Sequence, residues 1–170
     1  MCGIAGYVGD RESADVLVDA LSKLEYRGYD SAGIAVFDHG NIKVKKCKGR
    51  LANLVEKMDE EGKPQGHVGI GHTRWATHGE PSDINSHPHG NKRVTIVHNG
   101  IIENYKKLKD FLVGEGYSFA SETDTEVAAK LLDYYYDGDP MKTIAKVLSE
   151  IKGSYALGIM FRDFPDEIFA

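Results

Sequence analysis

The sequence contains few of the features that mark secreted, membrane-spanning or nucleic-acid-binding proteins. Its 170 residues include only two cysteines, Cys2 and Cys47, too few for a disulfide framework. No apolar run approaches the roughly 20 residues that span a bilayer, and the first residues lack the basic segment that opens a secretory signal. A net charge of −5 disfavours a broad surface for polyanions. These absences favour a cytoplasmic enzyme or binding domain without nucleic-acid or membrane partners.

The rest of the composition is that of a folded domain. Hydrophobic residues make up 41% and charged residues 28%, far from the composition of a disordered chain. The length fits one domain, which can bury roughly 70% of its unfolded surface. Nineteen glycines against five prolines indicate many tight turns or close backbone approaches.

Hydrophobic periodicity predicts alternating strands and helices along the chain. Helices are expected over residues 12–25, 51–60 and 104–112, after the capping-box sequence at 123–126, and after Asp139-Pro140. Strands are expected over residues 4–8, 34–37, 42–46, 68–75, 93–98 and 155–161, with another beginning at Ile168. Hairpin-linked strands with intervening helices predict an α+β fold of antiparallel sheets covered by helices, rather than a doubly wound sheet. The chain stops inside an apolar run at residues 167–170, which suggests a truncated domain with an unpaired edge strand.

Cys2 is the first candidate for chemistry. If Met1 is removed, Cys2 carries a free α-amine beside its own thiol. That amine titrates near about 7.7–8.0 when unperturbed, so it can act as the base for the side chain. The competing interpretation is a small apolar residue that opens a strand.

Two further groups could serve acyl transfer to or from an amino-acid substrate. The amide of Asn99 and the N–H of Gly100 could hold an oxyanion, although Asn-Gly is also a common turn. Arg74 could bind an α-carboxylate and Asp124 an α-ammonium. The alternatives are that Asp124 only favours a helix dipole, and that Arg74 makes a surface ion pair or a cation–π contact with Trp75.

Metal and nucleic-acid sites have weak support. His87-Pro88-His89 is accompanied by neither a Cys-x-x-Cys nor a His-Glu-x-x-His sequence, so no metal is expected. The lysine-rich segment 43–50 is well explained as a solvated face or a protected sheet edge.

The start of the chain and four motifs that follow it resemble one family over essentially the whole chain. The start, MCGI, resembles that of class II glutamine amidotransferases. Residues 26–33 (YRGYDSAG), 72–79 (HTRWATHG), 98–104 (HNGIIEN) and 121–126 (SETDTE) narrow the resemblance. They are similar to the glutaminase domain of the isomerising glutamine–fructose-6-phosphate aminotransferases, the glucosamine-6-phosphate synthases.

The resemblance implies the four-layer αββα sandwich of N-terminal nucleophile hydrolases, with L-glutamine as substrate and no cofactor. Cys2 would attack the side-chain amide and form a glutamyl thioester, while Asn99 and Gly100 hold the oxyanion. Arg74, with Thr77 and His78, would bind the substrate carboxylate, and Asp124 the ammonium. In supporting roles, Arg27 would position the N-terminus and Trp75 would lie near the route by which ammonia leaves.

The resemblance also implies a larger protein. Residues 1–170 would be the glutamine amidotransferase domain, incomplete at its C-terminal end, and a sugar-phosphate isomerase domain would follow in a full-length chain that forms a homodimer or a higher oligomer. Two rival interpretations remain. The first is another amidotransferase, such as the phosphoribosylpyrophosphate or asparagine-synthesising enzyme, against which the stretch at 74–79 argues. The second is a catalytically silent glutamine-binding or assembly module.

Overall fold

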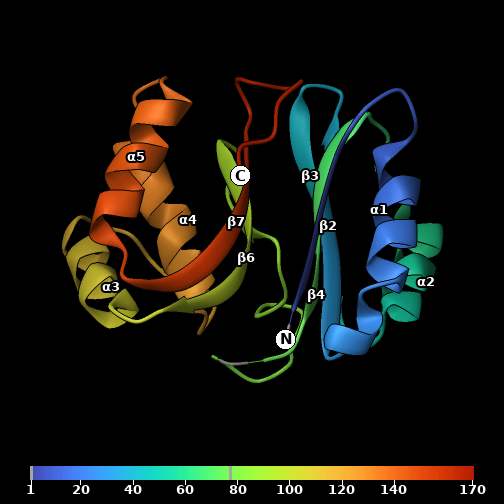
Figure 1. Ribbon diagram of the computed structural model, residues 1–170, viewed down its shortest axis with the longest axis horizontal. Helices are drawn as coiled ribbons and strands as arrows, with labels where there is room; N and C mark the ends of the chain where they lie inside the picture. Colours follow the sequence, from blue (N-terminus) through green and yellow to red (C-terminus); the bar gives the residue numbers. More distant parts are fainter. Residues whose placement is uncertain (1, 77) are drawn as a thin grey trace.

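The protein is a sandwich of two antiparallel sheets, each covered by helices on its outer side (Figure 1). The computed structural model describes residues 2–76 and 78–170. The first sheet has the order β1-β4-β2-β3, with β1 (Gly3–Val8), β2 (Ser31–Asp38), β3 (Asn41–Lys48) and β4 (Val68–Arg74). The second has the order β5-β6-β7, with β5 (His89–Gly90), β6 (Val94–Ile102) and β7 (Gly153–Phe161).

Five α-helices form the outer layers. On the first sheet lie α1 (Ser13–Ser22) and α2 (Leu51–Glu61), and on the second lie α3 (Tyr105–Gly114), α4 (Asp124–Tyr135) and α5 (Pro140–Glu150). The layer order α, β, β, α confirms the expected αββα architecture. None of the helices in the described part of the chain is long and apolar enough to cross a bilayer.

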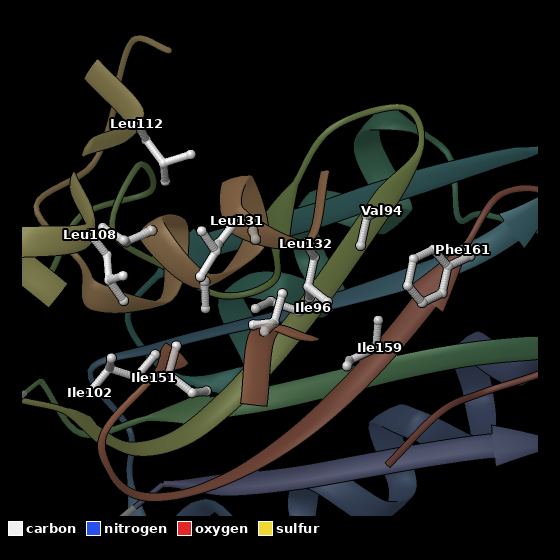
Figure 2. Close-up of a cluster of buried hydrophobic side chains, with 14 residues drawn as sticks. Val94, Ile96, Ile102, Leu108, Leu112, Leu131, Leu132, Ile151, Ile159 and Phe161 are labelled. Atoms are coloured by element: carbon white, nitrogen blue, oxygen red, sulfur yellow. The ribbon is translucent and has the colours of Figure 1, made fainter. Parts of the chain in front are cut away.

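Each layer contact has its own apolar core. Leu17, Leu21, Ile34 and Leu54 lie between the first sheet and its helices. Figure 2 shows the larger cluster between the second sheet and α3–α5, with Val94, Ile96 and Ile159 from the strands opposite Leu108, Leu131, Leu132 and Ile151. A third cluster joins the two sheets: Ala35, Phe37, Val68, Ile70, Val97 and Met160. Odd and even strand positions therefore serve different cores, as the period of two requires.

Between residues 4 and 161 the predicted helices and strands occur in the predicted order, with β5 in addition, and several boundaries differ. The first helix ends at Ser22 rather than near residue 25, and a short 3-10 helix follows at Glu25–Arg27. The strand expected to stop before Asn99 continues to Ile102, because β7 pairs with it as far as Gly153. Asn99-Gly100 is therefore strand and not a turn, since long-range pairing outweighs the local turn preference.

Two polar segments also differ from expectation. Residues 81–91 are turn-rich as expected, yet they contain the two-residue strand β5 and bury Asn85 and His87. Lys46 is not a solvated edge residue, although β3 is the sheet edge. Its amine donates to the carbonyls of Ile84, Ser86 and Pro88, and burial lowers its pKa to about 8. Near the C-terminus, Phe169 forms only a single bridge to Ile159 rather than the predicted strand.

Candidate active site

A cavity lies where the start of the chain, the ends of β4 and β6 and the first turn of α4 meet. Both sheets contribute to it, because β4 belongs to the first and β6 to the second. Figure 1 shows the start of the chain at the lower end of the sandwich, close to the end of β4, with which it pairs at Gly3 and Thr73. Its lining is Cys2, Arg74, Trp75, His78, His87, His98, Gly100, Thr123, Asp124 and Thr125.

The Cys2 thiol lies at the end of β4. Its Sγ accepts a hydrogen bond from the backbone N–H of Trp75 at 3.3 Å, and lies 3.6 Å from the carbonyl oxygen of the same residue. Burial raises the pKa of the Cys2 thiol, and the nearby Asp30 raises it further, while the Trp75 N–H and the Arg74 charge lower it. The net effect is a raised pKa, so this thiol needs a base before it can attack.

The oxyanion candidates approach Cys2 from the other sheet. Asn99 Nδ2 donates to the carbonyl oxygen of Cys2 at 3.4 Å, and Gly100 lines the cavity. A Cβ on Gly100 would lie 2.1 Å from the carbonyl oxygen of Ser154, and its φ is +138°. Only glycine satisfies both conditions, so the backbone of β6 reaches the cavity without a side chain.

Arg74 is buried at the end of β4 and organises the loop that follows. Its Nη2 donates to the carbonyl oxygens of His78 and, at 3.0 Å, Gly79, and its Nη1 donates to Glu80 at 3.4 Å. Asp30 lies 4.0 Å from Nη1. Burial lowers the pKa of the Arg74 guanidinium, against the raising effect of Asp30. The surface ion pair and the cation–π contact with Trp75 are therefore not what the guanidinium makes.

Asp124 is the first residue of α4 and is 3% exposed. Its Oδ2 accepts the backbone N–H of Ile102 at 2.8 Å, and its Oδ1 lies 4.0 Å from His98 Nδ1. Thr123 caps the helix by accepting the N–H of Glu126 at 3.2 Å. The capping box is only half formed, because the Glu126 carboxylate accepts from Ala120 and Ser121 rather than from Thr123. Asp124 is thus not needed as the cap, as the sequence indicated.

Of the remaining predicted site residues, some line the cavity and others do not. Trp75 and His78 line the cavity, and the His78 ring meets Tyr105 edge-on at 5.0 Å. Arg27 lies in the 3-10 helix and is not among the lining residues. Thr77 lies outside the described residues.

Sequence comparison agrees with this geometry. A profile of the glutamine amidotransferase domain matches residues 72–169, more than half of the chain. The chain belongs to the glutamine amidotransferase domain family. The same segment holds Arg74, Gly100 and Asp124, the residues that approach Cys2 at the cavity.

The amidotransferase domain has close relatives among curated proteins. It is 57% identical to the glutamine–fructose-6-phosphate aminotransferase [isomerizing] of Clostridium tetani and 58% identical to that of Caldanaerobacter subterraneus, each over 172 aligned residues and 100% of this chain. The chain spans only 28% of the length of either relative. Among solved structures, it resembles glutamine phosphoribosylpyrophosphate amidotransferase from B. subtilis with a TM-score of 0.82 and 29% identity, over 95% of this chain and 35% of that one.

Three polar residues that organise the amidotransferase site were missed in the sequence. Asn85 Nδ2 donates to the Glu80 carbonyl oxygen at 2.9 Å, and its Oδ1 accepts the N–H of Glu122 at 3.0 Å. It thereby ties the loop after Arg74 to the turn before α4. Asp30 accepts the N–H of Ala76 and holds the start of the same loop. Thr125 joins the rings of His98 and His87. No sequence signal distinguishes Asn85 within a polar, turn-rich segment, whereas Asp30 and Thr125 belong to the motifs at 26–33 and 121–126, which are the signal that could have identified them.

The buried histidines of the amidotransferase domain are used as neutral hydrogen-bonding groups. His89 Nε2 lies 3.2 Å from Thr123 Oγ1, and the ring of His72 stacks on that of His87 at 4.0 Å. Burial lowers the pKa of His72 to about 3 and those of His87 and His89 well below the usual value.

Proposed function

We propose that this domain hydrolyses the side-chain amide of L-glutamine to glutamate and ammonia through a thioester on Cys2. The observation that carries the proposal is the meeting of a nucleophile, a buried cation and a buried carboxylate in one cavity, supplied by Cys2, Arg74 and Asp124. An α-amino acid carries the complementary carboxylate and ammonium, and its side-chain amide would then face the thiol.

The bond changes follow from the positions around Cys2. The sulfur attacks the amide carbon and the carbonyl oxygen becomes negative, next to the Gly100 backbone and within reach of the Asn99 amide. Collapse breaks the C–N bond, with the thiol proton carried to the leaving nitrogen, and releases ammonia. Water then adds to the thioester and releases glutamate. The base is the α-amine of Cys2 once Met1 has been removed.

Arg74 would act on the substrate mainly as a positive charge. A guanidinium has five N–H donors, and three hydrogen bonds already run from Arg74 to the carbonyls of the following loop. Thr77 and His78 would supply further donors to the same carboxylate. Asp124 Oδ2 is occupied by Ile102, so Oδ1 is the oxygen left for the ammonium.

The acceptor of the ammonia is proposed from the relatives. The curated proteins with 57% and 58% identity are named glutamine–fructose-6-phosphate aminotransferases, whereas the phosphoribosylpyrophosphate amidotransferase is 29% identical. We therefore favour ammonia delivery to fructose 6-phosphate, giving glucosamine 6-phosphate for amino-sugar synthesis. The isomerase domain would be the partner, within a longer chain that forms a homodimer or higher oligomer in the cytoplasm.

Glutamate release from glutamine tests the proposal against a silent binding module. Cys2→Ala should abolish release, while Cys47→Ala, the matched control in the buried face of β3, should leave the rate within about twofold of wild type. A wild-type chain that binds glutamine without releasing glutamate would favour the silent module. Equal losses in both variants would remove Cys2 as the nucleophile.

A further inference from the structure

Two buried imidazole rings, those of His98 and His87, line the cavity beside Asp124 and are joined by Thr125. Neither ring has a role in the proposed thioester chemistry. Their hydrogen bonds nevertheless determine where their protons reside, because one member of the chain is a backbone amide.

The backbone N–H of His98 donates to His87 Nδ1 at 3.4 Å. An amide nitrogen only donates, so His87 Nδ1 is the acceptor. Burial lowers the pKa of His87 well below its usual value, and a neutral imidazole carries one proton. That proton is therefore on Nε2 of His87, which faces Thr125 Oγ1 at 3.3 Å.

The Thr125 hydroxyl links the proton position of His87 to that of His98. Thr125 Oγ1 accepts from His87 and has one proton to donate. Its other described partner is His98 Nδ1, at 2.8 Å. Donation to that nitrogen satisfies both groups, and it makes His98 Nδ1 an acceptor. Asp124 Oδ1 at 4.0 Å is too far to bind a proton on the same nitrogen. Burial also lowers the pKa of His98, against the raising effect of Asp124, so the ring is neutral and its single proton lies on Nε2.

The Nε2–H of His98 is then a donor held inside the cavity wall. His98 is 2% exposed, and its Nε2 has no hydrogen-bond partner among residues 2–76 and 78–170. Buried donors in native proteins are almost always satisfied. An acceptor that enters the cavity, such as a substrate oxygen, would satisfy this donor.

We propose that His98 Nε2–H donates to an oxygen of the substrate α-carboxylate, and that Thr125 and His87 position its proton for that contact. The carboxylate is chosen because the ring lies beside Asp124, whose proposed partner is the ammonium on the same substrate carbon. A neutral donor suits this place, since an imidazolium would repel that ammonium. The substrate part rests on the proposed function; the position of the proton does not.

The proton position is measured directly by 15N–1H correlation spectra of the histidine rings, on the chain labelled with 15N-histidine at pH 7. The His98 signals are identified by their loss in His98→Gln. We expect the Nε2–H tautomer in the free wild-type protein. Thr125→Val should give a mixture or the other tautomer. Thr95→Val should not, because Thr95 is a buried threonine of β6, the strand that carries His98, and its hydroxyl donates to the Asn91 carbonyl oxygen. An Nδ1–H tautomer in the wild type would overturn the proposal.

The substrate contact is measured in the Cys2→Ala variant, which should bind glutamine without consuming it. Glutamine should move the His98 Nε2–H resonance downfield, together with the backbone amide of Ile102, which reports on Asp124. If the Ile102 amide responds and the His98 proton does not, or the latter continues to exchange with water, the inference is wrong. If neither responds, glutamine does not bind, and the proposed function is wrong instead.

Steady-state kinetics of His98 variants distinguish a hydrogen bond to the substrate carboxylate from a role of His98 in packing alone. His98→Asn keeps an acceptor oxygen at the position of Nδ1 but has no atom at the position of Nε2. His98→Gln instead places an amide N–H near the position of Nε2. We expect about a ten- to hundredfold rise in KM for the Asn variant, the usual loss for a hydrogen bond to a charged group, with kcat changed less and partial rescue by Gln. The effect should vanish with 4-aminobutanamide, which lacks the carboxylate. An equal penalty on both substrates would contradict the assigned contact.

Discussion

Gly100→Ala is the substitution whose effect the structure determines most sharply. The residue lies in β6 with φ +138°, and an added Cβ would lie 2.1 Å from the Ser154 carbonyl oxygen and 2.7 Å from the Cα of Tyr155. Both neighbours are backbone atoms of β7, so no side chain can rotate away. Either β7 moves or the peptide at position 100 adopts another conformation, and both remove the present alignment of Gly100 with Cys2.

The magnitude has two parts. A non-glycine residue at such a φ costs about 1–3 kcal/mol. Separating the strands to relieve the overlap weakens the local ladder, at about 1 kcal/mol for each hydrogen bond lost. The free energy of unfolding should fall by about 3 kcal/mol, which lowers Tm by about 6–12 °C in a domain of this size.

Two control variants separate stability from catalysis. Gly153→Ala has the same defect on the facing strand β7, two residue pairs from Gly100 along the ladder, with φ +135° and a contact of 2.1 Å to the Ile101 carbonyl oxygen, but it does not line the cavity. Gly114→Ala, at the end of α3 with open space around it, should be neutral or stabilising by up to about 1 kcal/mol. Urea unfolding and glutamate release are measured for all three variants. An unfolding free energy of Gly100→Ala within 0.5 kcal/mol of wild type, about the scatter of harmless surface substitutions, would refute the backbone argument, and equal activity losses at 100 and 153 would refute the oxyanion role.

The other predictions concern charge. Arg74→Lys should raise KM for glutamine more than it lowers kcat, because a point charge cannot replace the fork that holds the following loop; an unchanged KM in steady-state kinetics would show that these loop bonds do not support glutamine binding. A preparation that retains Met1, identified by mass, should be nearly inactive beside the processed chain, since an amide nitrogen on Cys2 is not basic; equal rates would exclude the α-amine as base. The bond from His39 and the N–H of Gln65 lower the pKa of Asp38 to about 2, below its unfolded value near about 3.9. Its stabilisation is therefore complete above pH about 4 and lost as pH falls towards about 2, so Asp38→Asn should flatten urea-unfolding stability across that interval, and an unchanged acid limb would contradict the shift.

The fold was predictable because local signals agreed with the long-range pairing. The stripes of α1 and α5, the Thr123 cap and the hairpin between β2 and β3 all lie where the periodicity placed them. The candidate site was predictable mainly through motif resemblance, since on position alone Cys2 could have been an ordinary strand residue. The cavity now groups it with Arg74, Gly100 and Asp124, while the catalytic and binding roles of these residues stay predictions.

What the sequence did not yield depends on contacts between distant segments. Nothing local distinguishes Asn85, which joins two loops through Glu80 and Glu122, from any polar turn residue. Likewise, an Asn-Gly pair favours a turn unless a partner strand pairs with it, as β7 does at Ala156 and Tyr155. The Lys46 amine became buried only because the loop at 84–88 folds over it.

Because the candidate site lies across two sheets, its geometry depends on how the sheets pack against each other. Cys2 and Arg74 are carried by one sheet and Gly100 by the other, and the described sheets are held together by an apolar joint that includes Val97, Ile70 and Met160. The distance from the proposed nucleophile to the proposed oxyanion position is thus a separation between two sheets packed face to face, not a length inside one rigid element. If Cys2 and Gly100 have the proposed roles, the packing of side chains that do not line the cavity, among them Val97, Ile70 and Met160, determines the geometry between them.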